Sequence, residues 1–281
     1  MNIVSIIPAR GGSVRVPRKN LLPLCGLPLI AWTVKASVAS RLINDSYVVT
    51  DSEEIAEVSQ KHGAKIIWQS KWQADTAVHY GGTVAFLVGM DEAEKIQPVD
   101  IWVNLFCTTP LRKPDDIDNA IRQFIAHPYC SRQLSMSRRV EQVLWEDIGD
   151  GMAALHVFEK NPHLLADVSG LCTVTTARYL RWMSEWQFSR YDIDHPMVHV
   201  GNQGVYLVEQ WQGYDIDTTE DFDIVKVLFE QKIFQEMGAD VYERYAADGD
   251  HAGTGRVSEC ADIQRQHTSR DPEHGDTTLV F

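Results

Sequence analysis

Short apolar strands and amphipathic helices alternate along residues 2–126, and this alternation limits the folds that the chain can adopt. Strand-like segments cover residues 2–7, 47–50, 64–68 and 100–105, and helical segments cover residues 29–40, 53–62, 76–94 and 114–126. Helices of this length between strands place the strands parallel in one sheet, with helices on both faces. We therefore predict an α/β fold with a mostly parallel sheet, whose ligands lie outside the carboxyl ends of the strands.

The alternation is lost beyond residue 130 and returns with a strand at 203–208 and an amphipathic helix at 219–235. Residues 130–195 form short mixed segments with many aromatic side chains. We interpret this stretch as an insertion, in which the aromatic side chains serve either an oligomer interface or core packing. Residues 246–281 contain few large apolar side chains, so we predict one domain at 1–245 followed by a mobile tail.

Composition excludes several classes of function. The chain has 281 residues, with 26 Lys and Arg against 39 Asp and Glu, and a formal net charge of -13. Such an acidic chain is a poor general binder of nucleic acid or of anionic membranes, so we expect neither as a partner. Five scattered cysteines without a C-x-x-C pair indicate neither a disulfide framework nor a cysteine zinc site. The apolar stretch at 21–32 is interrupted by Pro23, Gly26 and Pro28, so we expect a soluble, cytoplasmic protein.

The loop after the first strand combines glycines with basic and hydroxyl side chains. These residues are Arg10, Gly11, Gly12, Ser13, Arg15, Arg18 and Lys19. Glycines let backbone N–H groups approach an anion closely, and arginine presents a fork of donors to phosphate oxygens. The loop lacks the G-x-x-x-x-G-K-[ST] pattern of a P-loop. It is either a phosphate-binding loop or a solvated basic turn.

Two carboxylates, Asp215 and Asp217, precede the last predicted helix. In an extended backbone they lie on the same face, where they could share a hard divalent cation with phosphate oxygens. Thr218, with Asp221 three residues later, also matches a variant of the capping box that starts a helix. The segment is therefore either a metal site or a helix start, and its spacing alone favours the helix start.

Hydroxyl and amide side chains mark two further segments. Thr108, Thr109 and Arg112 lie between a strand and a helix, where they could hold a nucleotide or an acidic substrate, or form an ordinary turn. Asn202 precedes the strand at 203–208 and could contact a base or a sugar, although asparagine is also a common turn residue. The ten histidines show no metal-ligand spacing.

Taken in order, these segments resemble the CMP-N-acylneuraminate synthetases, the cytidylyltransferases that activate sialic acids. Each match is short, but the ordered set covers about residues 1–235. The matching segments are 7–13 (IPARGGS), 17–21 (PRKNL), 26–30 (GLPLI), 49–56 (VTDSEEIA), 74–76 (ADT), 108–112 (TTPLR), 201–206 (GNQGVY) and 215–218 (DIDT).

The resemblance implies a Rossmann-like nucleotidyltransferase fold with an inserted dimerisation lobe, and hence a homodimer. It also implies transfer of CMP from CTP to the anomeric hydroxyl of a sialic-acid-like 2-keto-3-deoxy acid sugar, with release of pyrophosphate. Mg²⁺ is the implied cofactor. In such chemistry the metal and basic side chains neutralise the charge that develops on the phosphate oxygens.

Carried over position by position, the resemblance also assigns roles to individual residues. It implies catalytic roles for Arg10, Arg15, Lys19 and Asp217. It implies nucleotide contacts for Arg10, Gly11, Gly12, Ser13, Lys19, Asn20 and Thr108. It implies substrate contacts for Thr109, Asn202 and Arg190, the last with the carboxylate of the sugar, and Mg²⁺ ligands in Asp215 and Asp217.

The chain departs from the family pattern at several positions near these segments, including Val78 and His79 where the family has a serine-rich stretch. Val14 stands where the family has a lysine, Phe106 stands where it has a glutamine, and Gln69 begins a Gln-Ser pair in place of Arg-Pro. Loss of the lysine weakens stabilisation of phosphate charge unless Arg15 or Arg18 replaces it. One alternative is therefore a diverged member that binds nucleotide with little catalysis, and another is a cytidylyltransferase for a different anionic acceptor. A sugar-phosphate nucleotidylyltransferase would need a longer glycine-rich loop with a trailing lysine.

Overall fold

The fold is seen in a computed structural model, which describes residues 1–80, 82–127, 130, 132–138, 141–149, 152–160, 165–167, 170–176, 179 and 203–247. The strands are β1 (Ile3–Pro8), β2 (Pro23–Leu24), β3 (Leu27–Pro28), β4 (Asp45–Thr50), β5 (Lys65–Trp68), β6 (Ile101–Asn104), β7 (Arg132–Arg138), β8 (Glu141–Gly149), β9 (Met152–Lys160), β10 (Leu165–Asp167), β11 (Thr173–Thr176) and β12 (Gln203–Val208). The α-helices are α1 (Leu29–Ala39), α2 (Glu53–Lys61), α3 (Lys71–Tyr80), α4 (Thr83–Glu94), α5 (Asp116–Ala126), α7 (Thr219–Leu228) and α8 (Val241–Ala247). The 3-10 helices are η1 (Lys19–Leu21) and η2 (Gln210–Gly213), and η3 (Phe229–Gln235) is a π-helix.

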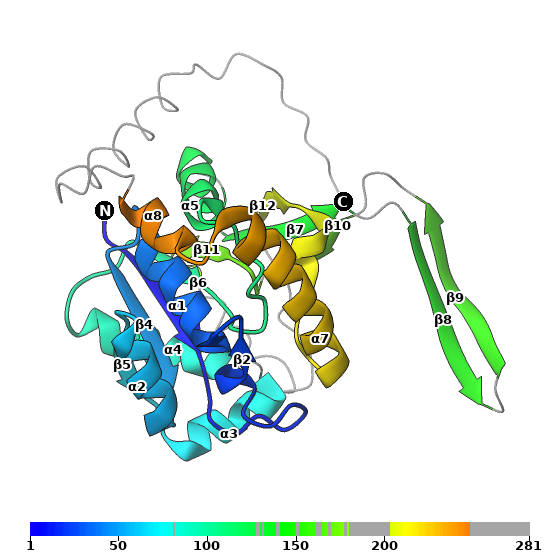
Figure 1. Ribbon diagram of the computed structural model, residues 1–281, viewed down its shortest axis with the longest axis horizontal. Helices are drawn as coiled ribbons and strands as arrows, with labels where there is room; N and C mark the ends of the chain where they lie inside the picture. Colours follow the sequence, from blue (N-terminus) through cyan, green and yellow to red (C-terminus); the bar gives the residue numbers. More distant parts are fainter. Residues whose placement is uncertain are drawn as a thin grey trace, which may run out of the picture.

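Eight strands form one sheet in the order β10-β7-β11-β6-β1-β4-β5, with β12 paired to β7 (Figure 1). β1 is parallel to β4 on one side and to β6 on the other, and β4 is parallel to β5. β11 runs antiparallel to both β6 and β7. The chain adds β4 and β5 on one side of β1 and then adds β6 on the other side. This reversal makes a topological switch point between β1 and β6, where α/β proteins of this type bind ligands.

Helices cover both faces of the sheet, because alternate residues of each strand point to opposite faces. In β1, Ile3 and Ile7 belong to the larger hydrophobic core, which includes side chains of α1, α2, α5, α7 and α8. Val4 and Ile6 belong to a second core with side chains of α4. The predicted α/β fold with a mostly parallel sheet is confirmed, with parallel pairs across β5-β4-β1-β6 and between β7 and β12.

Two predicted helices are divided in the structure. The segment predicted as one helix at 76–94 consists of α3, which begins at Lys71, and α4, which begins after Gly82. A Cβ on Gly82 would lie 2.6 Å from the ring of Phe106, so only glycine lets the chain pass this close to the ring. The helix predicted at 219–235 is α-helical to Leu228 and continues as the π-helix η3. None of the helices in the described ranges is long and apolar enough to cross a membrane.

The stretch predicted as an insertion contributes to two different parts of the structure. β7, β10 and β11 join the main sheet, so these segments are part of the domain core. β8 and β9 pair antiparallel as a two-stranded ribbon, which projects away from the sheet (Figure 1). At the other predicted boundary, α8 continues to Ala247, and residues 248–281 of the predicted tail lie outside the described residues.

Candidate active site

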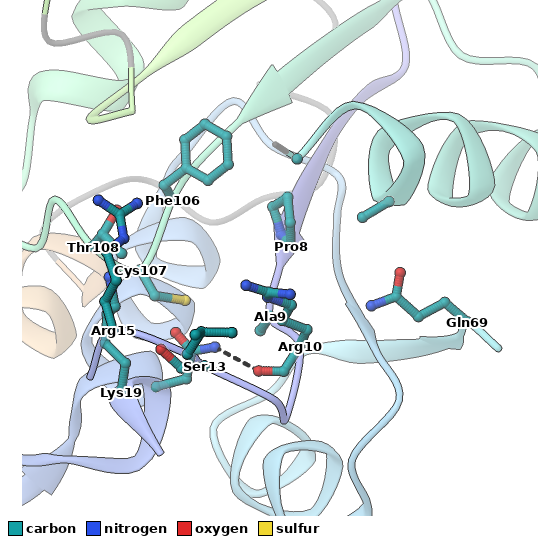
Figure 2. A pocket seen from close by; sticks show the side chains of 14 residues that line it. Pro8, Ala9, Arg10, Ser13, Arg15, Lys19, Gln69, Phe106, Cys107 and Thr108 are labelled. Carbon is teal, nitrogen blue, oxygen red and sulfur yellow. Dashed lines mark hydrogen bonds between the residues drawn. The ribbon is translucent and has the colours of Figure 1, made fainter. Parts of the chain in front are cut away.

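A pocket of about 330 Å³ lies at the switch point of the sheet. Most of its lining comes from the carboxyl ends of three strands: the end of β1 and the loop after it, Gln69 after β5, and Phe106, Cys107 and Thr108 after β6. Gly82 and Ala85 at the start of α4 complete it. Figure 2 shows Lys19 and Arg15 at one end of the pocket and Gln69 at the opposite end. The volume is within the range of small-molecule sites, and the polar residues converge on it from separate elements.

The glycine-rich loop is held against the end of β4. The Gly11 N–H donates to Asp51 Oδ1 at 2.8 Å, and the Ser13 N–H donates to the Gly11 carbonyl at 3.2 Å. A Cβ on Gly11 would lie 3.0 Å from the Cβ of Ser52, so a side chain there would push the loop away from β4. Asp51 and Ser52, which the sequence matches only to a family segment and to the start of a helix, therefore fix the shape of the loop. Because it donates to Asp51, the N–H of Gly11 is already hydrogen-bonded within the protein.

Arg10, Ser13 and Asn20 line the pocket beside this loop. The Asn20 Nδ2 donates to the Arg10 carbonyl at 3.1 Å, which is the dashed line in Figure 2. The Arg10 guanidinium makes one long hydrogen bond, 3.5 Å from Nη1 to the Ala74 carbonyl, among the described residues. A guanidinium carries five N–H donors, so Arg10 keeps donors for a ligand in the pocket.

Lys19, Arg15 and Asp217 form an ion cluster at one end of the pocket. Arg15 Nη1 lies 3.0 Å from Asp217 Oδ2, and Lys19 Nζ lies 3.7 Å from Asp217 Oδ1. Lys19 is 9% exposed, and its Nζ also donates to the Ile216 carbonyl. Burial lowers the pKa of Lys19 below its usual value, and the carboxylates of Asp217 and Asp215 oppose this shift. Arg15 and Lys19 share the carboxylate of Asp217, and these two cations are the groups at this end of the pocket that suit an anionic ligand.

The helix that begins beside this cluster is capped without the carboxylates of Asp215 and Asp217. The Thr218 hydroxyl accepts a hydrogen bond from the Asp221 N–H, and the Asp221 carboxylate accepts from the N–H groups of Thr218 and Asp217. The capping box predicted from Thr218 and Asp221 is therefore present. Asp215 is exposed, and the Asp217 carboxylate pairs with Arg15 and Lys19.

The two carboxylates fit a magnesium ion that arrives with phosphate. Mg²⁺ is usually held by one or two carboxylates together with phosphate oxygens and water. Asp217 lies beside Arg15 and Lys19 of the pocket, and the carboxylate of Asp215 is near enough to Lys19 to favour its charged form, so the two residues supply that number of carboxylates. Within the described ranges there is no group of three or more acidic, histidine or cysteine side chains that could hold a metal by itself.

Thr108 and Thr109 have different environments. Thr108 lines the pocket, and its carbonyl accepts a hydrogen bond from the Ile216 N–H at 2.9 Å, which joins the loop after β6 to the Asp215–Asp217 segment. Thr109 is buried, and its hydroxyl donates to the Phe106 carbonyl and accepts from Arg112. The structure thus places Thr109 in the wall behind the pocket.

Arg112 holds this wall together. Its guanidinium is fully buried and donates to the carbonyls of Phe106, Gly170 and Leu171 and to the hydroxyl of Thr33. Three segments that are distant in sequence therefore meet at one side chain: α1, the loop after β6, and residues 170–171. A buried guanidinium satisfied by carbonyl oxygens is suited to fixing the shape of the pocket.

Four lining residues had no predicted role in the site: Gln69, Phe106 and Val14 were noted only as departures from a family pattern, and Cys107 was not singled out. Gln69 and Phe106 face the same pocket, and Val14 is 73% exposed at its rim. Cys107 also lines it, although burial raises the pKa of its thiol to about 12. Gln69, Phe106 and Cys107 come just after the ends of β5 and β6, and this position in the sequence was the signal that could have identified them. Two predicted contacts, Asn202 and Arg190, lie outside the described residues.

Comparison with known families identifies the class of this protein. Residues 4–241 match the sequence profile of the family described as Cytidylyltransferase. The chain therefore belongs to the cytidylyltransferase family, and it is a nucleotidyltransferase. The resemblance drawn from the ordered motifs is confirmed at the level of the family.

Individual relatives come from several organisms. The chain is 36% identical to CMP-N,N'-diacetyllegionaminic acid synthase of Legionella pneumophila over 125 residues, which is 43% of this chain and 52% of that protein. It is 26% identical to pseudaminic acid cytidylyltransferase of Campylobacter jejuni over 234 residues, 82% of this chain and 97% of that protein. A solved structure of CMP:2-keto-3-deoxy-manno-octonic acid synthetase complexed with CTP has a TM-score of 0.61, with 20% identity over 83% of this chain and 100% of its own. That structure supports the fold.

Proposed function

We propose that this protein transfers CMP from CTP to the anomeric hydroxyl of a sialic-acid-like 2-keto-3-deoxy acid sugar. The observation that carries the proposal is the pocket at the switch point, in which the glycine-rich loop, Arg10 and the cluster of Lys19, Arg15 and Asp217 lie together. These groups are what a triphosphate requires at one end of its site. The relatives that the chain matches are named for acid sugars of this kind.

The proposed reaction is a displacement at the α-phosphorus of CTP. The oxygen of the sugar's anomeric hydroxyl forms the new bond, the bond to the β-phosphate oxygen breaks, and pyrophosphate leaves with the electron pair. The hydroxyl proton passes to solvent. Lys19 and Arg10 would stabilise the negative charge that grows on the phosphate oxygens, since both side chains line the pocket and carry donors toward it.

Asp215 and Asp217 are the proposed ligands of Mg²⁺. The ion, when bound, would neutralise phosphate charge and orient the triphosphate. In the ligand-free protein Arg15 and Lys19 already neutralise Asp217. Arrival of CTP would let these two cations turn to the phosphates, while the carboxylate turns to the metal. Arg15 would thereby supply the positive charge that Val14 does not.

The proposed acceptor is an acid sugar with a carboxylate beside the anomeric carbon. Asn202 and Arg190, which lie outside the described residues, are its proposed contacts, and Thr109 is proposed to act on it from the wall behind the pocket. Because the hydroxyl of Thr109 is buried against Phe106 and Arg112, its proposed effect on the acceptor is exerted through the shape of the wall.

We also propose a homodimer that assembles through residues 130–195. An isolated two-stranded ribbon is at best marginally stable in water. The β8–β9 ribbon stands away from the sheet, so a second copy of the chain would give it a packing partner (Figure 1).

A diverged member that binds nucleotide with little catalysis is the second candidate. The observation that favours it is Val14, an apolar and exposed residue at the pocket rim where the family pattern has a lysine. Arg15, one residue further on, argues for the active enzyme because its guanidinium lies in the same ion cluster.

Pyrophosphate release separates these candidates. The assay combines the protein with Mg²⁺, CTP and a panel of sialic, legionaminic and pseudaminic acids, with ATP, GTP and UTP as nucleotide controls. We expect release with CTP and at least one acid sugar, and none without the sugar. Measurable CTP binding with no release from any sugar would favour the diverged member.

A further inference from the structure

The pocket contains one buried amide that the proposed chemistry does not use. Gln69 is 6% exposed and lines the pocket at the end opposite Lys19 (Figure 2). Its Oε1 is shielded from water and has no hydrogen-bond partner among the described residues. Its backbone N–H donates to the Thr50 carbonyl at 3.0 Å, which fixes the residue to the end of the sheet.

An acceptor in this position is costly for the ligand-free protein, because it has lost its hydrogen bonds to water and gained none. The lining of the pocket also includes the apolar residues Pro8, Ala9, Ala85 and Phe106. Because Gln69 lines the pocket, a ligand there is placed to supply the donor that Oε1 lacks.

The charge distribution in the pocket indicates which part of a nucleotide reaches Gln69. Lys19 and Arg15 take the phosphates at one end, so the base points to the other end. Apolar walls suit the two faces of a flat base, and an amide suits its edge. Cytosine carries an amino donor at position 4, whereas uracil carries a carbonyl acceptor there.

We propose that Gln69 is a specificity-determining residue that recognises the cytosine base of CTP by hydrogen bonding. Its Oε1 accepts a hydrogen bond from the 4-amino group of cytosine, and its Nε2 donates to N3. This inference rests on the proposed use of CTP and adds the group that selects cytosine. UTP places its 4-carbonyl oxygen, an acceptor, against Oε1. It can form two hydrogen bonds with Gln69 only if the side-chain amide rotates by about 180° and exchanges Oε1 and Nε2.

The first test changes the ligand and leaves the protein intact. Calorimetry measures binding of CTP, of UTP and of the pyrimidin-2-one ribonucleoside triphosphate, which is CTP without its 4-amino group. We expect CTP to bind about tenfold more tightly than either, the effect of one hydrogen bond to a buried acceptor. Equal binding of CTP and the analogue overturns the proposal.

The second test changes the protein. Gln69→Leu keeps the size of the side chain, so CTP should bind about tenfold more weakly and no better than the analogue, while inorganic tripolyphosphate should bind as before. Gln133→Leu is the matched control, since Gln133 is a buried glutamine that does not line the pocket and whose Oε1 has no hydrogen-bond partner in the described part of the chain. It should keep the tenfold preference for CTP.

The outcomes separate this inference from the function on which it rests. A Gln69→Leu protein that keeps the preference for CTP over the analogue overturns the role of Gln69. A wild-type protein that binds no CTP overturns the proposed function and the inference together. A wild-type protein that binds CTP and makes CMP-sugar, but binds UTP equally well, overturns the inference alone.

Discussion

Asp217 pairs with Arg15 and Lys19 across the mouth of the pocket, although it lies one residue before the cap of α7. Both cations come from the loop that follows β1, so the residue joins two segments that are distant in sequence. The Arg15 pair is largely exposed and contributes little to stability. The environment of Asp217 is therefore better explained by ligand binding than by folding.

Asp217→Asn should lower turnover at saturating Mg²⁺ and CTP by a hundredfold or more, because it removes a proposed metal ligand while leaving the cap intact. Thr218→Ala is the matched control. It should lower the free energy of unfolding by about 1 kcal/mol through loss of the cap and keep turnover per folded molecule. Urea unfolding and pyrophosphate release measure the two effects. If Asp217→Asn were instead unstable but fully active, Asp217 would serve the start of α7 and would not be a metal ligand.

Cys107 lines the pocket but should not react as a nucleophile. Burial raises the pKa of its thiol to about 12, so the neutral thiol persists through the physiological pH range and the reactive thiolate forms only in strong alkali. Iodoacetamide at pH 8 should leave Cys107 unmodified in the native protein and modify it after denaturation, as measured by peptide mass spectrometry. Rapid labelling of Cys107 in the native protein at that pH would show that the pocket is more open than described.

At the scale of elements, α8 and the loop after β6 are connected through one residue. The Tyr242 hydroxyl in α8 donates to the backbone carbonyl of Arg112 at 2.8 Å. The Arg112 guanidinium in turn donates to the backbone carbonyls of Phe106 and Gly170. The C-terminal helix of the described chain thus supports the pocket wall from behind.

Arg112→Met should lower the free energy of unfolding by more than about 3 kcal/mol, because several buried carbonyls lose their donors together. Tyr242→Phe removes one hydrogen bond and should cost about 1 kcal/mol. Chemical unfolding of the two variants checks whether Arg112→Met loses more free energy of unfolding than Tyr242→Phe. Equal small effects would mean that the wall is held by apolar packing alone.

The sequence predicts elements well where the signal is local. The strand at 203–208 and the starts of α1 and α2 agree with their predictions, because apolar periodicity and the Ser52 cap define them. The division between α3 and α4 was not predicted, since it depends on the close approach of Phe106 to Gly82 from a distant segment. β7, β10 and β11 were not predicted either. Their short mixed sequences become strands through pairing with the rest of the sheet.

At the scale of the whole molecule, the sheet order brings the loop after β1, Gln69 and the loop after β6 to one pocket. The basic loop and Thr108 could be predicted for this site because strand ends gather there. The pairing of Asp217 with Arg15, the burial of Thr109 and the unpaired amide of Gln69 could not, because each depends on contacts between segments far apart in sequence.

The proposed homodimer gives a prediction at this scale. Sedimentation equilibrium of the full chain at micromolar concentration should give a mass of twice 31.8 kDa. Replacing 141–160 with a short Gly-Ser loop should shift the protein to the monomer, because the projecting ribbon is removed. A wild-type monomer under these conditions would contradict the dimer.

The central claim is that the basic end of this pocket is where CTP reacts, and Lys19 tests it most directly. Lys19→Met keeps the length of a side chain that is largely buried but removes its charge. The measurement is kcat/KM for CTP in the pyrophosphate-release assay, with the best acid sugar at saturation. Removal of a group that stabilises phosphate charge should lower this value by a hundredfold or more. A value within threefold of wild type, from a variant that is correctly folded, would show that the reaction takes place elsewhere.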